Sequence, residues 1–262
     1  MNDLWQDLKK ITALLTSSRT KLLLFDFDGT LAPIVQSPKE AMLPIETKKL
    51  LEKLCQKPNL YLAVVSGRTL EDIKEKIGLP NIIYGGNHGL EGEIFGKKYS
   101  FPIPSKTDST LKKIRKSLDK ISDQFKGILI ENKELSLSFH YRLTDTGQIS
   151  KIISLLDKTL KPYVEKKLIC IIAGKKVVDV IPYVNWNKGH FAALVIKQIT
   201  AKTRKRPVTV VVGDDETDED TFKYLKNDIT IVVGNKRQSK AKYYLKNPKE
   251  VVKFLKLLNT II

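Results

Sequence analysis

Four short apolar runs in this chain of 262 residues each end directly in a polar loop, and this recurrence restricts the fold more than any other feature. The runs are Lys21 to Phe25, Leu60 to Val65, Asn81 to Tyr84 and Pro207 to Val212. Helical spacing of apolar residues follows the first two runs. These helices are predicted over Pro44 to Cys55 and from an N-cap at Thr69 to Ile77. Strand, polar loop and helix in repetition are typical of a parallel sheet with helical crossovers. We therefore predict an α/β fold with a Rossmann-like parallel-sheet core.

The pattern changes in the middle of the chain. Between two proline-bearing segments, the spacing predicts a helix, a hairpin, a second helix and a second hairpin. In the predicted strand Leu135 to Arg142, apolar and polar side chains alternate, which gives the sheet one apolar and one polar face. We predict an α+β unit at residues 103–182, inserted into a core formed by residues 1–102 and 183–262.

The first pattern resumes after this insert. A helix is predicted after Lys188, and the apolar run Ile229 to Val233 predicts a further strand. The acidic stretch Gly213 to Asp220 is predicted to be a loop. Asn247 followed by Pro248 marks the start of the last helix, because proline is favoured in the first helical position.

The charge balance is strongly basic, with 46 Lys and Arg residues against 29 Asp and Glu residues, a net charge of +17. Most of the basic residues are lysines, and the densest stretches, Lys202 to Arg206 and Lys236 to Lys256, contain little of the arginine and aromatic interleaving that nucleic-acid recognition uses. We therefore expect no nucleic-acid partner. A lysine-coated surface that attracts small anionic substrates explains the charge better.

Composition also restricts the class of protein. No apolar run reaches the roughly 18 residues of a membrane helix, and Met1 to Lys10 lacks the apolar stretch of a signal peptide. Cys55 and Cys170 alone provide neither a disulfide framework nor the spacing of a zinc site. We expect a folded, cytoplasmic protein that is monomeric and has no membrane partner.

The loops after the predicted strands carry acidic, hydroxyl and amide side chains. In chain order these are Asp26 and Asp28, Ser66, Asn87 and His88, and finally Asp214, Asp215 and Asp218. Because the carboxyl ends of parallel strands meet at one edge of a sheet, we expect the five carboxylates to converge there. A divalent cation would relieve their repulsion, and oxygen donors without Cys or His favour Mg²⁺.

An Asp-x-Asp pair directly after a buried strand suits phosphoryl transfer. Asp26 can act as a nucleophile that forms an aspartyl-phosphate, and Asp28 can protonate the leaving group and then activate water. Ser66 and Lys188 can hold the phosphate. Each motif alone also has an ordinary structural explanation: an Asx turn, a loop with an N-cap, or a charged helix N-terminus. Their joint occurrence, each after a strand, favours the chemical interpretation.

The longer strings resemble a known family. Asp26-Phe27-Asp28-Gly29-Thr30-Leu31, Ser66, Lys188 and Gly213-Asp214-Asp215 are similar to the four motifs of phosphatases of the haloacid dehalogenase (HAD) superfamily. Strings that resemble trehalose-6-phosphate phosphatases in particular are Val65-Ser66-Gly67-Arg68, Gly86-Asn87-His88-Gly89, His140-Tyr141-Arg142, Asn187-Lys188-Gly189 and Gly213 to Asp220. The insert falls where that family carries its cap, so the resemblance implies a HAD core with an α+β cap.

The resemblance also implies roles for single residues. Mg²⁺ would be held by the Asp26 side chain, the Asp28 main-chain carbonyl and Asp214, with Asp215 or Asp218 acting through water or from a second layer. Residues implied near the substrate lie in both the core and the cap: Arg68, Asn87, His88, Glu131, Lys133, His140, Arg142 and Asp179. The family typically has Glu where this chain has Asp179, so the reach toward a sugar hydroxyl differs.

Together these features predict a Mg²⁺-dependent phosphatase that releases trehalose and phosphate from trehalose 6-phosphate, a small phosphorylated disaccharide. One alternative is a phosphatase for another sugar phosphate or a glycosylated compatible-solute precursor. A signalling receiver module is another, but Asp28, the insert and the length argue against it. A basic nucleic-acid binder is the third.

Overall fold

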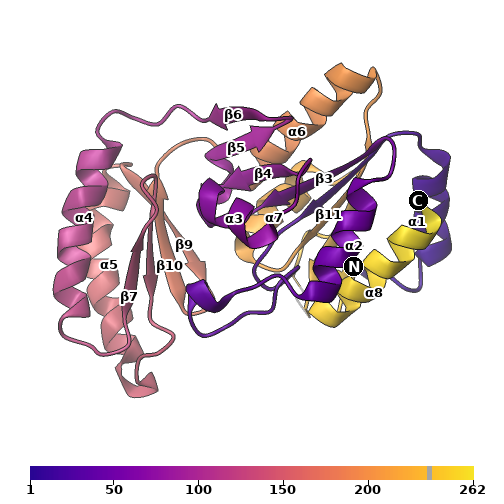
Figure 1. Ribbon diagram of the computed structural model, residues 1–262. Coiled ribbons are helices and arrows are strands. Elements are labelled where there is room, and N and C mark those ends of the chain that lie inside the picture. The colour runs from indigo at the N-terminus through magenta and orange to yellow at the C-terminus, as the bar shows by residue number, and fades with distance from the viewer. Residues whose placement is uncertain (235–237) are drawn as a thin grey trace. The chain divides into compact units, whose positions relative to one another are not determined.

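A computed structural model describes residues 1–234 and 238–262 (Figure 1), so Lys236, at the start of the second basic stretch, lies outside the described residues. The described chain divides into two compact units. The first comprises Met1–Ser100 and Trp186–Ile262, and the second comprises Phe101–Asn185. The second unit is therefore an insertion between the two halves of the first.

The first unit is built on one large sheet. Its described strands lie in the spatial order β1 (Asn2–Asp3), β13 (Tyr243–Leu245), β12 (Ile229–Val233), β11 (Val208–Gly213), β2 (Lys21–Phe25), β3 (Leu60–Val65), β4 (Ile83–Gly86), β5 (Glu91–Ile94) and β6 (Lys97–Ser100). Neighbours pair in parallel from β1 to β4, while β5 and β6 pair antiparallel. The prediction of an α/β fold with a parallel-sheet core is confirmed.

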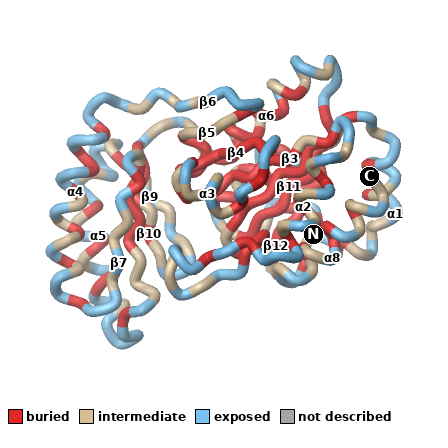
Figure 2. Tube along the Cα trace, in the orientation of Figure 1, coloured by how far each residue is buried: buried red, intermediate tan, exposed pale blue. Residues whose placement is uncertain are grey.

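Alternate side chains of the central strands point to opposite faces of this sheet, and each face is covered by helices. On β2, Leu23 and Phe25 pack into one apolar cluster, and Leu22 and Leu24 pack into another. The first cluster is covered by α1 (Leu8–Ser17), α2 (Ile45–Cys55), α3 (Leu70–Ile77) and α8 (Pro248–Ile261). The second is covered by α6 (Lys188–Thr203) and α7 (Glu216–Tyr224). The central strands are accordingly buried along most of their length (Figure 2).

Helix boundaries follow local capping chemistry. Thr69 caps α3 by accepting from the Asp72 amide, as the sequence predicts, and Gly78 follows its last residue in the left-handed region. Asn247 caps α8 in the same way as Thr69 caps α3. The prediction of a loop over Gly213 to Asp220 is wrong in its second half. There Asp215 and Asp218 form a capping box that starts α7 at Glu216.

The second unit has a four-stranded antiparallel sheet in the order β7 (Leu129–Asn132), β8 (Leu137–His140), β10 (Val177–Pro182) and β9 (Ile169–Gly174). Its helices α4 (Thr107–Ser122) and α5 (Ile149–Glu165) present Ile114, Leu118 and Leu156 to an apolar cluster that includes Phe139 and Val180 of the sheet. The 3₁₀ segments are η1 (Pro38–Glu40), η2 (Asn87–Gly89) and η3 (Thr146–Gln148). Among the described residues, none of the helices is long and apolar enough to cross a membrane.

Candidate active site

Two neighbouring strands at the centre of the large sheet bring two aspartates together. Asp26 directly follows β2 and Asp214 directly follows β11, and the two strands pair in parallel with Phe25 opposite Val212. The Asp26 amide extends this pairing by donating to the Val212 carbonyl at 2.9 Å. Both carboxylates therefore stand at the carboxyl ends of adjacent strands, where α/β proteins bind ligands.

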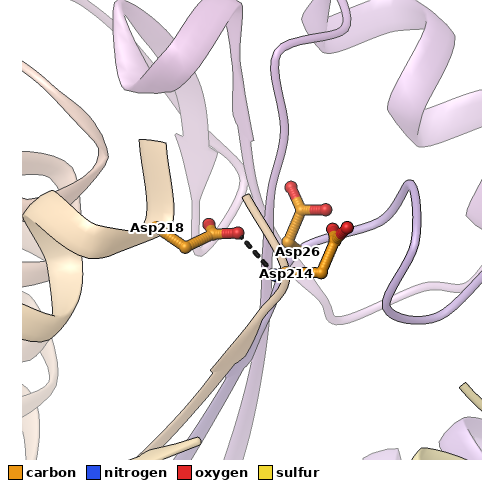
Figure 3. Close-up of side chains that lie close together, drawn as sticks. All are labelled: Asp26, Asp214 and Asp218. Carbon is orange, nitrogen blue, oxygen red and sulfur yellow. Dashed lines mark hydrogen bonds between the residues drawn. The ribbon is translucent and has the colours of Figure 1, made fainter. Parts of the chain in front are cut away.

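A third carboxylate comes from the first turn of α7. Asp26, Asp214 and Asp218 are all buried, and each offers an oxygen within 4.8 Å of the others (Figure 3). Asp218 is held in place because its Oδ2 accepts the amide of Asp214 at 2.9 Å and that of Asp215 at 3.1 Å. The strand ends and the helix start thus place three carboxylates in one buried group.

Two glycines make room for this group. Gly29 has φ +89°, a conformation that L side chains rarely adopt, and a Cβ there would collide with the Asp214 carboxylate. A Cβ on Gly213 would collide with the Asp218 carboxylate. The glycines of the Asp-Gly-Thr and Gly-Asp-Asp strings therefore have a steric function at the site.

Lys188 is the buried cation of this group. It is the first residue of α6, which Asn187 caps, and its Nζ lies 2.7 Å from Oδ1 of Asp26 and 2.9 Å from Oδ1 of Asp218. Burial alone would lower the pKa of Lys188, but Asp218 and Asp26 raise it well above its ordinary value. Lys188 is therefore a fixed positive charge between two of the three carboxylates.

The structure distinguishes Asp215 from Asp218. Burial would raise the pKa of Asp215, but Lys188 and the hydrogen bond from Thr217 lower it to about 2. Its Oδ1 caps α7 by accepting the amide and the hydroxyl of Thr217 at 2.9 Å and 2.6 Å. Burial raises the pKa of Asp218 to about 7, against the opposing effect of Lys188. The same burial, together with the neighbouring aspartates, raises the pKa of Asp26.

The group has the donor set of a hard-cation site. Within the described part of the chain, the group has three buried carboxylates, two of which contact one buried lysine, and this leaves an excess of negative charge in a region of low dielectric constant. All the candidate ligands are oxygen atoms, which divalent cations such as Mg²⁺ and Ca²⁺ prefer. The residues present therefore fit a divalent cation.

Asp28 has a different partner. Arg68, between β3 and α3, binds both of its oxygens, with Nε 2.7 Å from Oδ2 and Nη2 2.8 Å from Oδ1. Arg68 also connects to Ser66, because its amide donates to the Ser66 Oγ at 3.2 Å. Ser66 lies directly after β3 and is buried. Arg68 and Ser66, predicted as separate site residues, thus belong to one hydrogen-bonded loop.

The third predicted loop is also buried. The Asn87 side chain donates to Glu91 Oε1 at 2.6 Å, and the same oxygen accepts the Leu70 amide at the start of α3. His88 has φ +58° and lies against Gly67, where an added Cβ would be 2.6 Å from its ring. Glu91 was not predicted as a site residue, because it lies on β5, a strand that was not predicted either.

The second unit gathers most of its predicted site residues on one sheet face. Glu131, Ser138 and Asp179 lie opposite one another on β7, β8 and β10, and the Ser138 hydroxyl donates to Asp179. Lys133 Nζ is 3.7 Å from Asp179. His140 Nε2 is 3.4 Å from Glu131.

Arg142 follows β8 and donates to the Lys175 carbonyl at 2.6 Å, a contact that does not involve the other four predicted residues of this unit. Ser138 was not predicted as a site residue, and its contact with Asp179 makes it part of this cluster.

The fold of this chain is similar to that of a solved haloacid dehalogenase-like hydrolase. A structure described as a haloacid dehalogenase-like hydrolase from Bacteroides thetaiotaomicron superposes with a TM-score of 0.62, at 14% identity, over 92% of this chain and 100% of that chain. The profile of the trehalose-phosphatase family matches residues 24–249, and the chain belongs to this family. The family resemblance stated from the sequence is therefore confirmed.

Individual proteins share this fold or have a similar sequence. The C-terminal domain of the C. albicans trehalose-6-phosphate phosphatase superposes with a TM-score of 0.86, at 24% identity, over 100% of this chain and 99% of that domain. Trehalose-phosphate phosphatase B of Arabidopsis thaliana is 28% identical over 90% of this chain. The chain spans 66% of the length of that plant protein, about two thirds.

Proposed function

We propose that this chain is a Mg²⁺-dependent phosphomonoesterase that hydrolyses trehalose 6-phosphate to trehalose and phosphate. The observation that carries the proposal is the buried group of Asp26, Asp214 and Asp218 with Lys188, at the ends of β2 and β11. Membership of the trehalose-phosphatase family and the names of the plant and fungal relatives support this substrate.

The proposed reaction has two displacements at phosphorus. An Asp26 oxygen attacks the phosphate, the bond between phosphorus and the sugar oxygen breaks, and Asp28 gives a proton to that oxygen. A water molecule then attacks the aspartyl-phosphate, Asp28 takes its proton, and the bond between phosphorus and Asp26 breaks. Ser66 and Lys188 hold phosphate oxygens during both steps.

Mg²⁺ would be held by the Asp26 side chain, the Asp28 main-chain carbonyl and Asp214, and would neutralise charge on the phosphate oxygens. Asp218 supports this set through the bonds that it accepts from the Asp214 and Asp215 amides. Asp215 acts one layer further out, because its carboxylate caps α7.

We also propose that the second unit acts as the cap that recognises the sugar. Its candidate contacts are Glu131, Lys133, His140, Arg142 and Asp179. Arg68, Asn87 and His88 are the candidates in the core.

A second candidate substrate is another sugar phosphate or a glycosylated compatible-solute precursor. Asp179 favours this second candidate. Its carboxylate already accepts the Ser138 hydroxyl and lies beside Lys133, and these contacts limit how far the carboxylate can reach toward a sugar.

The test is phosphate release from trehalose 6-phosphate, glucose 6-phosphate and sucrose 6-phosphate, with Mg²⁺ and with EDTA. We expect Mg²⁺-dependent preference for trehalose 6-phosphate that is lost in Asp26→Asn. Preference for another sugar phosphate would be compatible with the proposed reaction but would refute trehalose 6-phosphate as the substrate. Turnover that persists in Asp26→Asn would overturn the nucleophile.

A further inference from the structure

Both the main chain and the side chain of Arg68 are held by hydrogen bonds to neighbouring residues of the first unit. Its amide donates to the Ser66 hydroxyl at 3.2 Å, and its carbonyl accepts the Asn87 amide at 2.6 Å. These two bonds tie its main chain to the ends of β3 and β4. The start of the side chain is therefore set by the large sheet itself.

The guanidinium is fixed as well. Besides the two bonds to Asp28, Nη1 donates to Asp72 Oδ2 at 2.7 Å and Nη2 donates to the Pro38 carbonyl at 3.0 Å. The Phe27 ring, fully buried, lies beneath it with 5.4 Å between the guanidinium carbon and the ring centroid. The Arg68 side chain is 9% exposed. Four hydrogen bonds and the contact with the Phe27 ring thus hold this group in place.

Asp28, in contrast, has a side chain that is 39% exposed. An aspartate in this position would sample several rotamers if it had no partner. The planar fork of an arginine matches the two oxygens of a carboxylate and fixes its plane, which a lysine ammonium does not do. Each carboxyl oxygen accepts one bond from Arg68 and keeps a second lone pair for a proton.

We propose that Arg68 is a positioning residue that holds the Asp28 carboxyl in the orientation from which it transfers a proton to the leaving oxygen. This inference rests on the proposed function, in which Asp28 supplies that proton as the phosphorus–oxygen bond breaks and remains as a carboxylate. It differs from the role implied by the family resemblance, in which Arg68 lies near the substrate. Proton transfer depends steeply on orientation, so a rigid anchor contributes to the rate without touching the sugar.

The test uses p-nitrophenyl phosphate and phenyl phosphate, which differ in the leaving group and contain no sugar. Protonation by a well-positioned acid speeds the departure of p-nitrophenol little, because it is an acidic leaving group, and speeds the departure of phenol much more. The value of kcat/KM reports the steps up to cleavage of the bond between phosphorus and this leaving oxygen. In Arg68→Gln we expect kcat/KM for phenyl phosphate to fall about tenfold more than that for p-nitrophenyl phosphate, part of the roughly 10²–10⁴-fold that general acids contribute. Asp28→Asn should lower kcat/KM for phenyl phosphate more than Arg68→Gln does, and it should again affect phenyl phosphate more than p-nitrophenyl phosphate.

Two further variants separate geometry from charge. Arg68→Lys keeps the charge but cannot span both oxygens of Asp28. Its ratio of kcat/KM for phenyl phosphate to kcat/KM for p-nitrophenyl phosphate should therefore shift toward that of Arg68→Gln. Arg206→Gln breaks a similar two-bond pair, between Arg206 and Asp228 directly before β12, outside the site, so its ratio should match that of the parent. Thermal unfolding of each variant tests whether the core remains folded.

The outcomes are distinct. An equal loss for both aryl phosphates in Arg68→Gln, or a parent-like ratio in Arg68→Lys, would overturn the positioning role of the fork. A loss confined to sugar phosphates would assign Arg68 to substrate binding instead. An unchanged ratio in Asp28→Asn would overturn the acid role of Asp28 in the proposed function. Failure to hydrolyse trehalose 6-phosphate would overturn only the proposed substrate, because the aryl ratio is measured without it.

Discussion

Lys188→Met removes the buried cation of the acidic group while keeping a side chain of similar length. The side chains of Lys188, Asp26 and Asp218 are only 3%, 6% and 5% exposed, so solvent cannot replace the lost charge. Removing one partner of a buried ion pair costs about 3–5 kcal/mol. For a domain of this size, each kcal/mol lowers the unfolding midpoint by roughly 2–4 °C. We therefore expect a midpoint lowered on the order of 10 °C in EDTA at pH 8.

Both pH and Mg²⁺ should change this loss of stability. Lys188 lowers the pKa of both Asp26 and Asp218, so both pKa values rise further in the variant. The folded variant takes up protons as the pH falls, and its deficit should shrink between pH 8 and pH 5. Excess Mg²⁺ supplies positive charge at pH 8 and should shrink it as well.

Tryptophan fluorescence is a suitable readout because Trp5 and Trp186 both lie in the first unit, so it follows the unfolding of that unit alone. Lys197→Met, at an exposed position of the same helix, is the matched control and should leave the midpoint unchanged. A Lys188→Met midpoint equal to that of the control in EDTA at pH 8 would refute the view that Lys188 compensates buried charge.

Three further perturbations test single contacts. Gly29→Ala should destabilise the core by about 1–3 kcal/mol and weaken Mg²⁺ binding in calorimetry, because an alanine at φ +89° is strained and its Cβ collides with Asp214. The control is Gly96→Ala, at φ +75° with open space around it, which should lose stability through the same strain but keep its Mg²⁺ binding. In EDTA, the parent should gain stability relative to Asp218→Asn as the pH falls from about 7 toward 4. The reason is that the Asp218 carboxyl binds a proton below a pKa of about 7 in the folded state and only near 3.8 in the unfolded state. Denaturant titrations in which the stability difference does not depend on pH would contradict the raised pKa. Asp179→Ala should raise KM for trehalose 6-phosphate in steady-state assays and leave kcat/KM for p-nitrophenyl phosphate unchanged, and equal effects on both would argue against a role in sugar recognition.

Local patterns in the sequence were sufficient to predict the central sheet. The runs Lys21 to Phe25 and Leu60 to Val65 became β2 and β3 with the same bounds, because mostly apolar runs of that length are typical of parallel strands buried on both faces. The edge strands were not predicted. The exposed Lys97–Ser100 lacks an apolar signal, and the two-residue Asn2–Asp3 is a strand only because it pairs with β13.

The acidic loop after β11 was harder to predict for a different reason. Asp215 and Asp218 are chemically identical in the sequence, and only the capping box, which depends on side-chain direction, separates them. The pairing of Arg68 with Asp28 joins residues 40 positions apart and has no local signal. Sequence spacing thus identifies which residues meet at a sheet edge, whereas the three-dimensional structure determines which atom contacts which.

The most direct test of the account is to trap the phosphorylated chain. The parent is mixed with trehalose 6-phosphate carrying a radiolabelled phosphate in the presence of Mg²⁺, quenched in acid within a turnover, and mapped by peptide analysis. We predict label on the peptide that contains Asp26, absent in Asp26→Asn and absent when EDTA replaces Mg²⁺. Phosphate release without label on the chain, or label on a different residue, would contradict the assignment of Asp26 as the nucleophile.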